Sequence, residues 1–220
     1  MAERECALCG APARLPYRAP PAEMAPDLDM RPGEPARSTM RFWVQTCTRC
    51  GASAPDLTAL PAAARAVMEG PAFAACRGTE PADAFLRWAV VARGCGQNAA
   101  AAEAMLQAAW LLDDAGQDGS AWRLAAIEDW GAPDGPQATL RQADVLRRAG
   151  QFDKAAALLD RGLPRDESVD AVAAYQHGLI AAEDRGPHSI ASALRPPARR
   201  PHASHKPAPA KQGFWARLRG

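Results

Sequence analysis

A 34-residue self-similarity in the middle of the chain restricts its possible folds more than any other sequence feature. When the sequence is shifted by 34 residues against itself, nine of 25 aligned positions are identical, where this Ala-rich composition would give roughly three by chance. Thirty-four residues is the length of the tetratricopeptide unit, in which a turn joins two antiparallel helices. The identical pairs are Ala104/Ala138, Leu106/Leu140, Ala109/Ala143, Leu112/Leu146, Ala115/Ala149, Gly116/Gly150, Gln117/Gln151, Ala121/Ala155 and Leu124/Leu158.

Helical spacing of apolar residues extends over residues 81–184, a region with few prolines. After a first helix that ends at Gly94, helices are expected over residues 98–115, 119–130, 136–149, 153–162 and 167–184. The last of these lacks the turn glycine and is expected to be a terminal cap. The sequence therefore predicts a mainly α fold built from tetratricopeptide-like helix pairs, with two repeats between a leading and a closing helix.

Two Cys-x-x-Cys-Gly motifs near the N-terminus carry the strongest chemical signal. Cys6 and Cys9 form the first pair, and Cys47 and Cys50 form the second. Two residues between ligands let both sulfurs face one ion, and four thiolates complete the tetrahedron that zinc prefers. The motifs predict a structural Zn²⁺ site, since four thiolates leave no open position for a catalytic water.

Three other roles are compatible with the same cysteine spacing. Iron fits the same tetrahedron, as in rubredoxin, and is the less favoured ion. Four reduced thiols buried as small hydrophobic side chains would need no metal. A thiol–disulfide role needs only one motif, so the second pair would be superfluous.

Residues 1–56 are expected to form a zinc-ribbon-like β module around these motifs. Thirty-seven residues separate Cys9 from Cys47, and their closely spaced prolines predict a long loop. The aromatic and β-branched residues within 40–46 predict a strand that enters the second motif. Residues 57–80 are expected to connect the module to the helices through one short helix, which begins after Pro61 and ends at Gly70.

The last segment, residues 185–220, differs from the rest of the chain in charge. It holds eight Lys and Arg residues and no Asp or Glu, whereas residues 1–184 carry a net charge of −7. Its prolines and scarce apolar residues predict a disordered basic tail. Near its end, a short apolar face beside cations suits an acidic partner or weak contact with a membrane surface. The residues of that face are Phe214, Trp215, Leu218, Lys211, Arg217 and Arg219.

The remaining reactive side chains form no catalytic constellation in the sequence, so the chain is expected not to be an enzyme. Cys76 and Cys95 lack a partner at ligand spacing, and His177 has no nucleophile or carboxylate arranged around it. His188, His202 and His205 could bind a metal weakly, but their irregular spacing gives this little support. Aromatic residues along the helices are expected to fill the seams between them, namely Trp88, Trp110, Trp122 and Trp130.

Targeting features are not evident in the sequence. The N-terminal residues lack the apolar segment of a signal peptide. The most apolar window, residues 99–112, is shorter than the ~20 residues that a bilayer-spanning helix needs. Cysteines that serve as metal ligands also agree with a reducing compartment. We therefore expect a cytoplasmic protein without a transmembrane segment.

Taken together, these motifs resemble an uncharacterised bacterial domain-of-unknown-function family, which pairs an N-terminal CxxC…CxxC element with tetratricopeptide-like helices. The resemblance covers roughly residues 5–184. It implies a zinc-ribbon-like module and a helical repeat, with no established activity. The motifs that carry it are CALCG, FWVQTCTRCG, AFLRWAV, QAAWLLDDAGQ and LRRAGQFDKAAALLD.

Two functional classes agree with these features. The first is a non-catalytic zinc-binding adaptor or scaffold, in which the helical repeats bind a protein or peptide partner. The second is a nucleic-acid-associated zinc-ribbon protein that uses the basic tail. Residues 1–60 contain seven Arg and seven acidic residues, so the module lacks the positive face that phosphate binding requires. The first class is therefore favoured.

Overall fold

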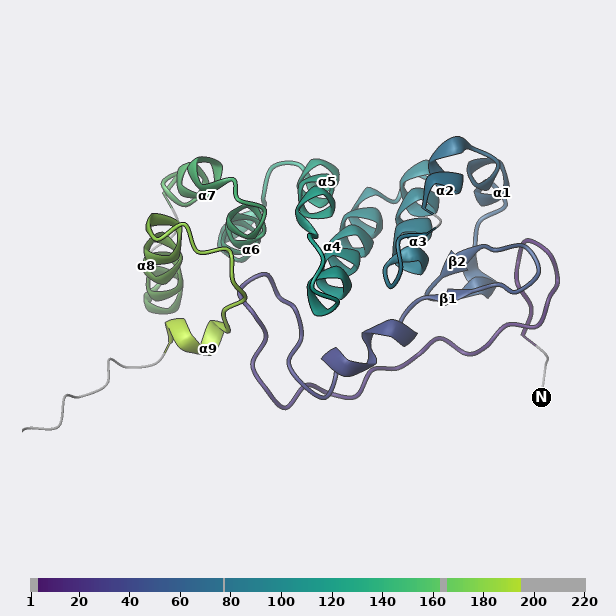
Figure 1. Ribbon diagram of the computed structural model, residues 1–220, viewed down its shortest axis with the longest axis horizontal. Helices are drawn as coiled ribbons and strands as arrows, with labels where there is room; N and C mark the ends of the chain where they lie inside the picture. Colours follow the sequence, from purple (N-terminus) through teal and green to yellow (C-terminus); the bar gives the residue numbers. More distant parts are fainter. Residues whose placement is uncertain (1–3, 77, 163–165, 195–220) are drawn as a thin grey trace, which may run out of the picture.

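The computed structural model describes residues 4–76, 78–162 and 166–194 and shows a mainly helical protein (Figure 1). From α3 to α7, helices that are neighbours in sequence pack against each other, and a small antiparallel sheet lies beside one end of the row. The predicted mainly α fold is thus confirmed. The helices are α1 (Ala64–Met68), α2 (Pro71–Ala75), α3 (Asp83–Gly94), α4 (Asn98–Asp114), α5 (Ser120–Trp130), α6 (Gly135–Arg148), α7 (Phe152–Leu159), α8 (Glu167–Ala181) and α9 (Ile190–Ala193), with 3₁₀ helices η1 (Arg37–Phe42) and η2 (Leu57–Ala59) and strands β1 (Gln45–Thr46) and β2 (Ser53–Ala54).

The turns after α4 and α6 share one hydrogen-bonding pattern. The Gly116 N–H donates to the Asp113 carbonyl and the next N–H reaches the Leu112 carbonyl, and Gly150 heads the same pattern after α6. Both glycines have positive φ angles, +70° and +75°, which side chains with a Cβ rarely adopt. These turns lie where the 34-residue shift aligns them. The assignment of the helices to the tetratricopeptide class stays a prediction.

Helix α8 ends in the same type of turn without a glycine. Here Glu183 adopts the positive φ angle, +52°, and its N–H donates to the Ile180 carbonyl. The following N–H, that of Asp184, donates to the Leu179 carbonyl, as in the two glycine turns. A helix end of the same type is therefore formed without the residue that marks it in the sequence.

The strand expected over residues 40–46 is mostly wrong. Residues up to Phe42 form η1, and only Gln45 and Thr46 form strand β1, which pairs with Ala54 and Ser53 of β2. Two contacts favour the helical turn, a hydrogen bond from the Trp43 indole to Thr39 and the full burial of Met40 in the helical core. Tertiary packing has overridden the β propensity of the aromatic residues.

The connecting region also differs from the prediction. It holds two helices, because α1 ends at Met68 and α2 begins with Pro71 as its first residue. Pro71 suits that position, where no backbone N–H is needed. Helix α7 ends at Leu159 and α8 at Ala181, each three residues before its expected end.

Residues 185–194, which were expected to belong to the disordered tail, form defined contacts instead. The Leu28 N–H donates to the His188 carbonyl, the Ile190 N–H donates to the Pro26 carbonyl, and α9 follows. This backbone pairing with residues far away in sequence orders the chain up to residue 194. Residues 195–220, which carry His202, His205 and the apolar basic face described above, lie outside the described residues. Within the described part, no helix combines the length and apolar character required to cross a bilayer.

Glycine 119 allows α4 and α5 to approach closely. A Cβ at Gly119 would lie 2.8 Å from the Ala109 carbonyl oxygen and 2.9 Å from the Ala109 Cβ. By contrast, a Cβ at Gly178, within α8, would meet none of the described neighbouring atoms within 4 Å. The same Gly→Ala substitution should therefore have opposite effects at the two sites.

We expect Gly119→Ala to lower the free energy of unfolding by about 1–3 kcal/mol, because it overpacks the α4–α5 contact. Gly178→Ala should raise it by about 0.5–1 kcal/mol, since alanine loses less backbone entropy in a helix. Urea unfolding of both variants at constant m-value measures the difference. Equal effects of the two substitutions would contradict the close helix approach.

Candidate metal centre and the strap that it closes

The Sγ atoms of the four predicted cysteine ligands lie close together. They all lie within 4.8 Å of one another, with Cys6–Cys50 at 3.8 Å and Cys9–Cys47 at 3.6 Å. A tetrahedron of sulfurs at the usual zinc–sulfur distance has edges of about 3.8 Å. The separations are far longer than the ~2.05 Å of a disulfide bond, and all four cysteines are free. The four thiols therefore could bind one metal ion.

Each Cys-x-x-Cys-Gly motif, which we call a knuckle, forms a tight turn closed by its glycine. The Gly10 N–H donates to the Cys6 carbonyl at 2.9 Å, and the Gly51 N–H donates to the Cys47 carbonyl at 3.0 Å. Their φ angles are +68° and +76°, which accounts for glycine after the second cysteine of both motifs. The first turn lies in the N-terminal segment and the second joins β1 to β2, so the two pairs come from separate parts of the module.

A small apolar cluster surrounds the thiols and limits water around them. Cys6 and Cys47 are almost fully buried, while Cys9 and Cys50 are half-buried. Arg49 donates to the Cys9 carbonyl at 3.0 Å, which holds the two knuckles together at the surface. The apolar residues around the thiols include Leu8, Ala11, Ala52, Leu57, Ala64 and Phe73. They connect the module to α1, α2 and, through Val91, α3.

Burial and local hydrogen bonds give Cys47 and Cys50 different pKa values. Burial raises the pKa of Cys47, but hydrogen bonds from the backbone N–H groups of Cys50 and Arg49 and from the Cys50 and Cys9 thiols together outweigh it and lower that pKa to about 7. Burial, together with the neighbouring thiols, raises the pKa of Cys50 to about 12. A divalent cation would stabilise all four as thiolates and displace their protons. The donor set of four sulfurs, without a carboxylate, suits a borderline or soft cation.

The chain between the knuckles does not stay in the N-terminal module. We call residues 17–44 the strap. It runs from the module along one side of the helices and returns through η1 to β1 (Figure 1). The proline-rich loop predicted from the sequence is confirmed as largely irregular, but its position on the helices was not predicted.

Asp29 of the strap is buried among helical cations. It has no exposed surface, and its Oδ2 accepts hydrogen bonds from the Trp110 indole at 2.8 Å and from Arg148 at 2.7 Å. Arg123 lies 3.8 Å from the same oxygen. Burial alone would raise the pKa of Asp29, but Arg148, Arg123 and the indole hydrogen bond outweigh it and lower the pKa. The carboxylate therefore stays ionised.

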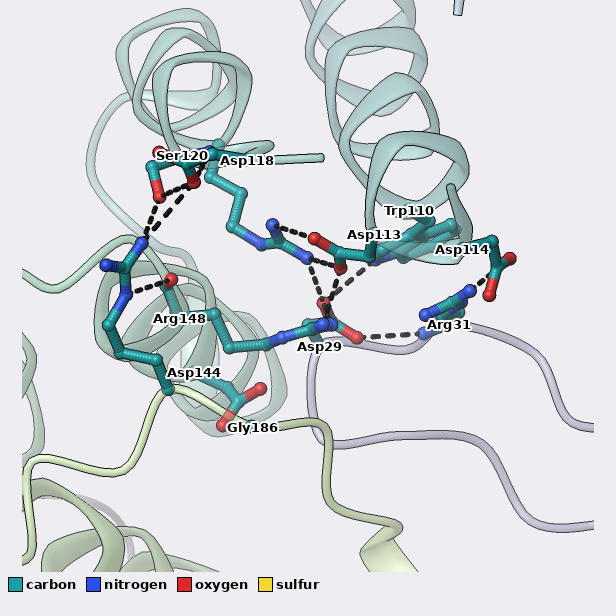
Figure 2. A network of polar contacts seen from close by, with 12 residues as sticks. Asp29, Arg31, Trp110, Asp113, Asp114, Asp118, Ser120, Asp144, Arg148 and Gly186 are labelled. Atoms are coloured by element: carbon teal, nitrogen blue, oxygen red, sulfur yellow. Dashed lines mark hydrogen bonds and ion pairs between the residues drawn. The ribbon is translucent and has the colours of Figure 1, made fainter. Parts of the chain in front are cut away.

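Figure 2 shows how this carboxylate joins the strap to α4, α5 and α6. Asp113 of α4 accepts from both Arg123 and Arg148 at 2.5 Å, so two carboxylates share two guanidinium groups. At the end of α4, Asp114 pairs with Arg31 and, at 2.8 Å, with Arg37, both from the strap side. The cations are thus neutralised within the network, which is the condition for burying them.

An apolar contact attaches the strap to α6–α8, and Arg147 holds the segment after α8, which pairs with the strap through Leu28 and His188. Leu28 is buried in the cluster formed by α6, α7 and α8. Arg147 of α6 is fully buried, pairs with Asp144 at 2.9 Å and donates to the Gly186 carbonyl at 2.9 Å. Sequence reasoning missed this network, because Asp29 and Arg31 in a proline-rich loop do not differ from solvated loop charges.

The other candidate residues do not belong to the four-thiol group, although Cys95 packs against the apolar cluster around it. Cys76 is buried and donates to the Ala72 carbonyl, and Cys95 is half-buried outside the thiol cluster. His177 lies 3.5 Å from Asp160, and its side chain is partly exposed while that of Asp160 is largely exposed. Among the described residues, the four cysteines are the only group of three or more metal-binding side chains.

The tryptophans and the described histidine have structural contacts. Trp110 is almost fully buried in the helical core, as predicted, and Trp88, Trp122 and Trp130 are half-buried against it. His188 bonds Asp184 at 2.9 Å and Tyr175 at 3.2 Å.

Comparisons of the chain with protein-family models, with curated proteins and with solved structures found no match. The resemblance to a CxxC…CxxC and tetratricopeptide-like family therefore depends on the motifs in the sequence alone. The functional argument therefore starts from the geometry of the site. Four thiols converge at the two ends of the strap, and the strap lies along a row of helices.

Proposed function

We propose that this chain is a non-catalytic, zinc-stapled adaptor whose helices bind a protein or peptide partner. The observation that carries the proposal is the convergence of four Sγ atoms from two segments 37 residues apart, with the strap between them attached to the helices. An ion at this point closes the strap at both ends. Its role is structural, since four thiolates leave no position for water or substrate.

Zinc is the ion that the proposal commits to. Iron would fit the same tetrahedron, and selection between the two depends partly on supply. The thiols are surrounded by apolar side chains and backbone hydrogen bonds, and this cluster packs against α1–α3. Because these surroundings are structural, they suit zinc, which is colourless and redox-inactive. No step of chemistry is assigned to it.

Purified protein should contain one equivalent of zinc and be colourless. The reason is that four converging sulfurs bind zinc with the apparent free energy of roughly 10–16 kcal/mol known for structural sites in small peptides. Elemental analysis of the full chain after gel filtration measures the stoichiometry, and visible absorption detects iron. One equivalent of iron would replace zinc in the proposal, and a metal-free folded protein would contradict it.

The partner-binding role is assigned to the helices and not to the module. The strap already covers part of one face of α4 and α6, through Asp29, Arg31 and Leu28. Cations of the module are also paired, for example Arg4 with Asp56 at 2.8 Å. A partner would therefore contact helical surface outside the strap, as stacked helices commonly do.

Cross-linking in the native host followed by mass spectrometry tests this role. We expect a protein partner whose cross-links map to residues 83–181 and that is retained when residues 195–220 are removed. Nucleic acid recovered instead, with binding that falls steeply with salt and disappears without residues 195–220, would favour the nucleic-acid class. A partner that cross-links only to the metal module would contradict the assignment to the helices.

A further inference from the structure

An open cavity lies where the strap, the α5–α6 turn, α6 and α9 meet. Its volume is about 630 Å³, within the range of about 300–1,000 Å³ typical of ligand pockets. Much of its wall is apolar and comes from segments far apart in sequence. Met30 of the strap, which exposes 48% of its surface, faces it together with Trp130, Pro133 and Ile190. Such a wall favours an apolar guest.

Arg141 also lines the cavity, but its charge is already neutralised. Two of its nitrogens donate to the Glu103 carboxylate at 2.5 and 2.8 Å, and its Nε donates to the Asp29 carbonyl at 3.1 Å. Its guanidinium carbon lies 4.7 Å from the centre of the Trp130 ring. The wall therefore presents a paired cation beside an aromatic ring, which suits an aromatic guest better than an anion.

Asp134 gives the cavity an acidic edge. It is exposed and lines the cavity at the start of α6. Although it is the N-cap residue of that helix, its side chain makes no capping hydrogen bond, so the carboxylate is available to a cation. The cavity thus combines an apolar and aromatic wall with one carboxylate at its edge.

We propose that residues 213–219 of this chain dock in the cavity. In this arrangement Phe214 and Trp215 contact the apolar wall, and Arg217 lies near Asp134. After residue 194, these two are the only aromatic residues other than histidine in the sequence, and a cation follows Trp215 two positions later. The segment therefore offers the same combination of aromatic and basic groups that the cavity would accept.

Charge and chain length support the same occupant. Residues 195–220 hold seven Lys and Arg residues and no acid. Because the whole chain carries +1, the preceding 194 residues carry −6, so the two parts attract each other. Nineteen residues, five of them prolines, lie between Leu194 and Phe214, and a chain of this length spans at least about 25 Å on average. Since Ile190 lines the cavity only four residues before Leu194, docking within one molecule is favoured by a high effective concentration.

A competition experiment with the zinc-loaded full chain tests the proposal. The probe is a fluorescent peptide of residues 211–220, and the double variant Phe214→Ala, Trp215→Ala provides a protein whose own segment no longer docks. We expect the probe to bind the double variant at least tenfold more tightly than the wild type, as measured by fluorescence anisotropy. Equal affinity for the two proteins would overturn docking within the chain.

A cavity-filling variant and a peptide control locate the binding. In the double-variant background, Ala138→Trp fills the cavity from α6 and should weaken probe binding at least tenfold. Ala174→Trp is the matched control, because Ala174 is exposed on α8 and does not line the cavity. A probe with alanine at both aromatic positions keeps all its cations and should not bind. If it binds as well as the original, the attraction is charge alone and the proposal fails.

Hydrogen exchange and sedimentation distinguish one chain from two. Wild-type protein should protect residues 130–142 more than the double variant does, at every protein concentration, and both should sediment as monomers. Protection that appears only with dimer formation would mean that the segment docks in a second copy, which overturns the proposal as stated. None of these readouts depends on the partner proposed for the helices.

Discussion

Cys47→Ser should remove the bound zinc and unfold the N-terminal module while leaving the helices folded. Cys47 is a buried member of the four-thiol cluster, 3.6 Å from Cys9, and a serine hydroxyl does not replace a thiolate as a zinc ligand. Metal binding of this kind stabilises small modules by roughly 10–16 kcal/mol, which exceeds what the small apolar cluster around the thiols can replace. Zinc content should fall from one equivalent towards none.

Far-UV circular dichroism, elemental analysis and hydrogen exchange measure this effect. The helical signal should be largely retained, because α4 to α8 have their own apolar clusters. Exchange should increase in the module and in the strap. Cys95→Ser is the matched control, since Cys95 is half-buried but lies outside the thiol cluster, and it should keep its zinc. Retained zinc in Cys47→Ser would refute the assignment of the ligands.

Asp29→Ala should lower the free energy of unfolding by about 3–5 kcal/mol. The substitution removes the acceptor for the Trp110 indole and for Arg148. Of the carboxylates that contact both Arg148 and Arg123 in the described structure, Asp113 then remains. Removing one partner of a buried ion network costs far more than the network contributes by itself. Urea unfolding and hydrogen exchange of residues 26–31 measure the loss and locate it.

Asp118→Ala is the control for this prediction. Asp118 also faces an arginine, Arg185 at 3.4 Å, but its side chain is 73% exposed. Exposed ion pairs contribute about 0–1 kcal/mol, and the Asp118 carboxylate also accepts from the Ser120 N–H at 3.0 Å at the start of α5, so the control should cost no more than about 1–2 kcal/mol. A small effect of Asp29→Ala, comparable to that of Asp118→Ala, would mean that the strap is held by other contacts.

The two predictions are linked through the strap. The zinc ion that we propose would close the loop between the two cysteine motifs, and closing a loop of this length in advance lowers the entropy cost of docking its middle on the helices. Loss of the metal should therefore weaken the contact of Asp29 with Arg148, and loss of Asp29 should not remove the metal. Combined in one chain, the two substitutions should cost less than the sum of their separate effects.

Local rules determined much of this protein from its sequence. Periodic apolar residues predicted most of the helices, and Gly116 and Gly150 marked their turns because both adopt positive φ angles. The two CxxCG motifs predicted the thiol cluster, since ligand spacing and the glycine turn are properties of a few consecutive residues. The strand expected over 40–46 failed where a tertiary contact, the burial of Met40, competed with local propensity.

Only the tertiary structure decided where the strap lies and which charges are buried. Asp29 meets Arg148 across 119 residues of sequence and Trp110 across 81. Nothing in the local sequence distinguishes Asp29 from a solvated loop charge, because the energy of a buried carboxylate depends on cations that the fold supplies. The cavity beside Met30 has the same origin, since its wall exists only after the strap, α6 and α9 have packed together.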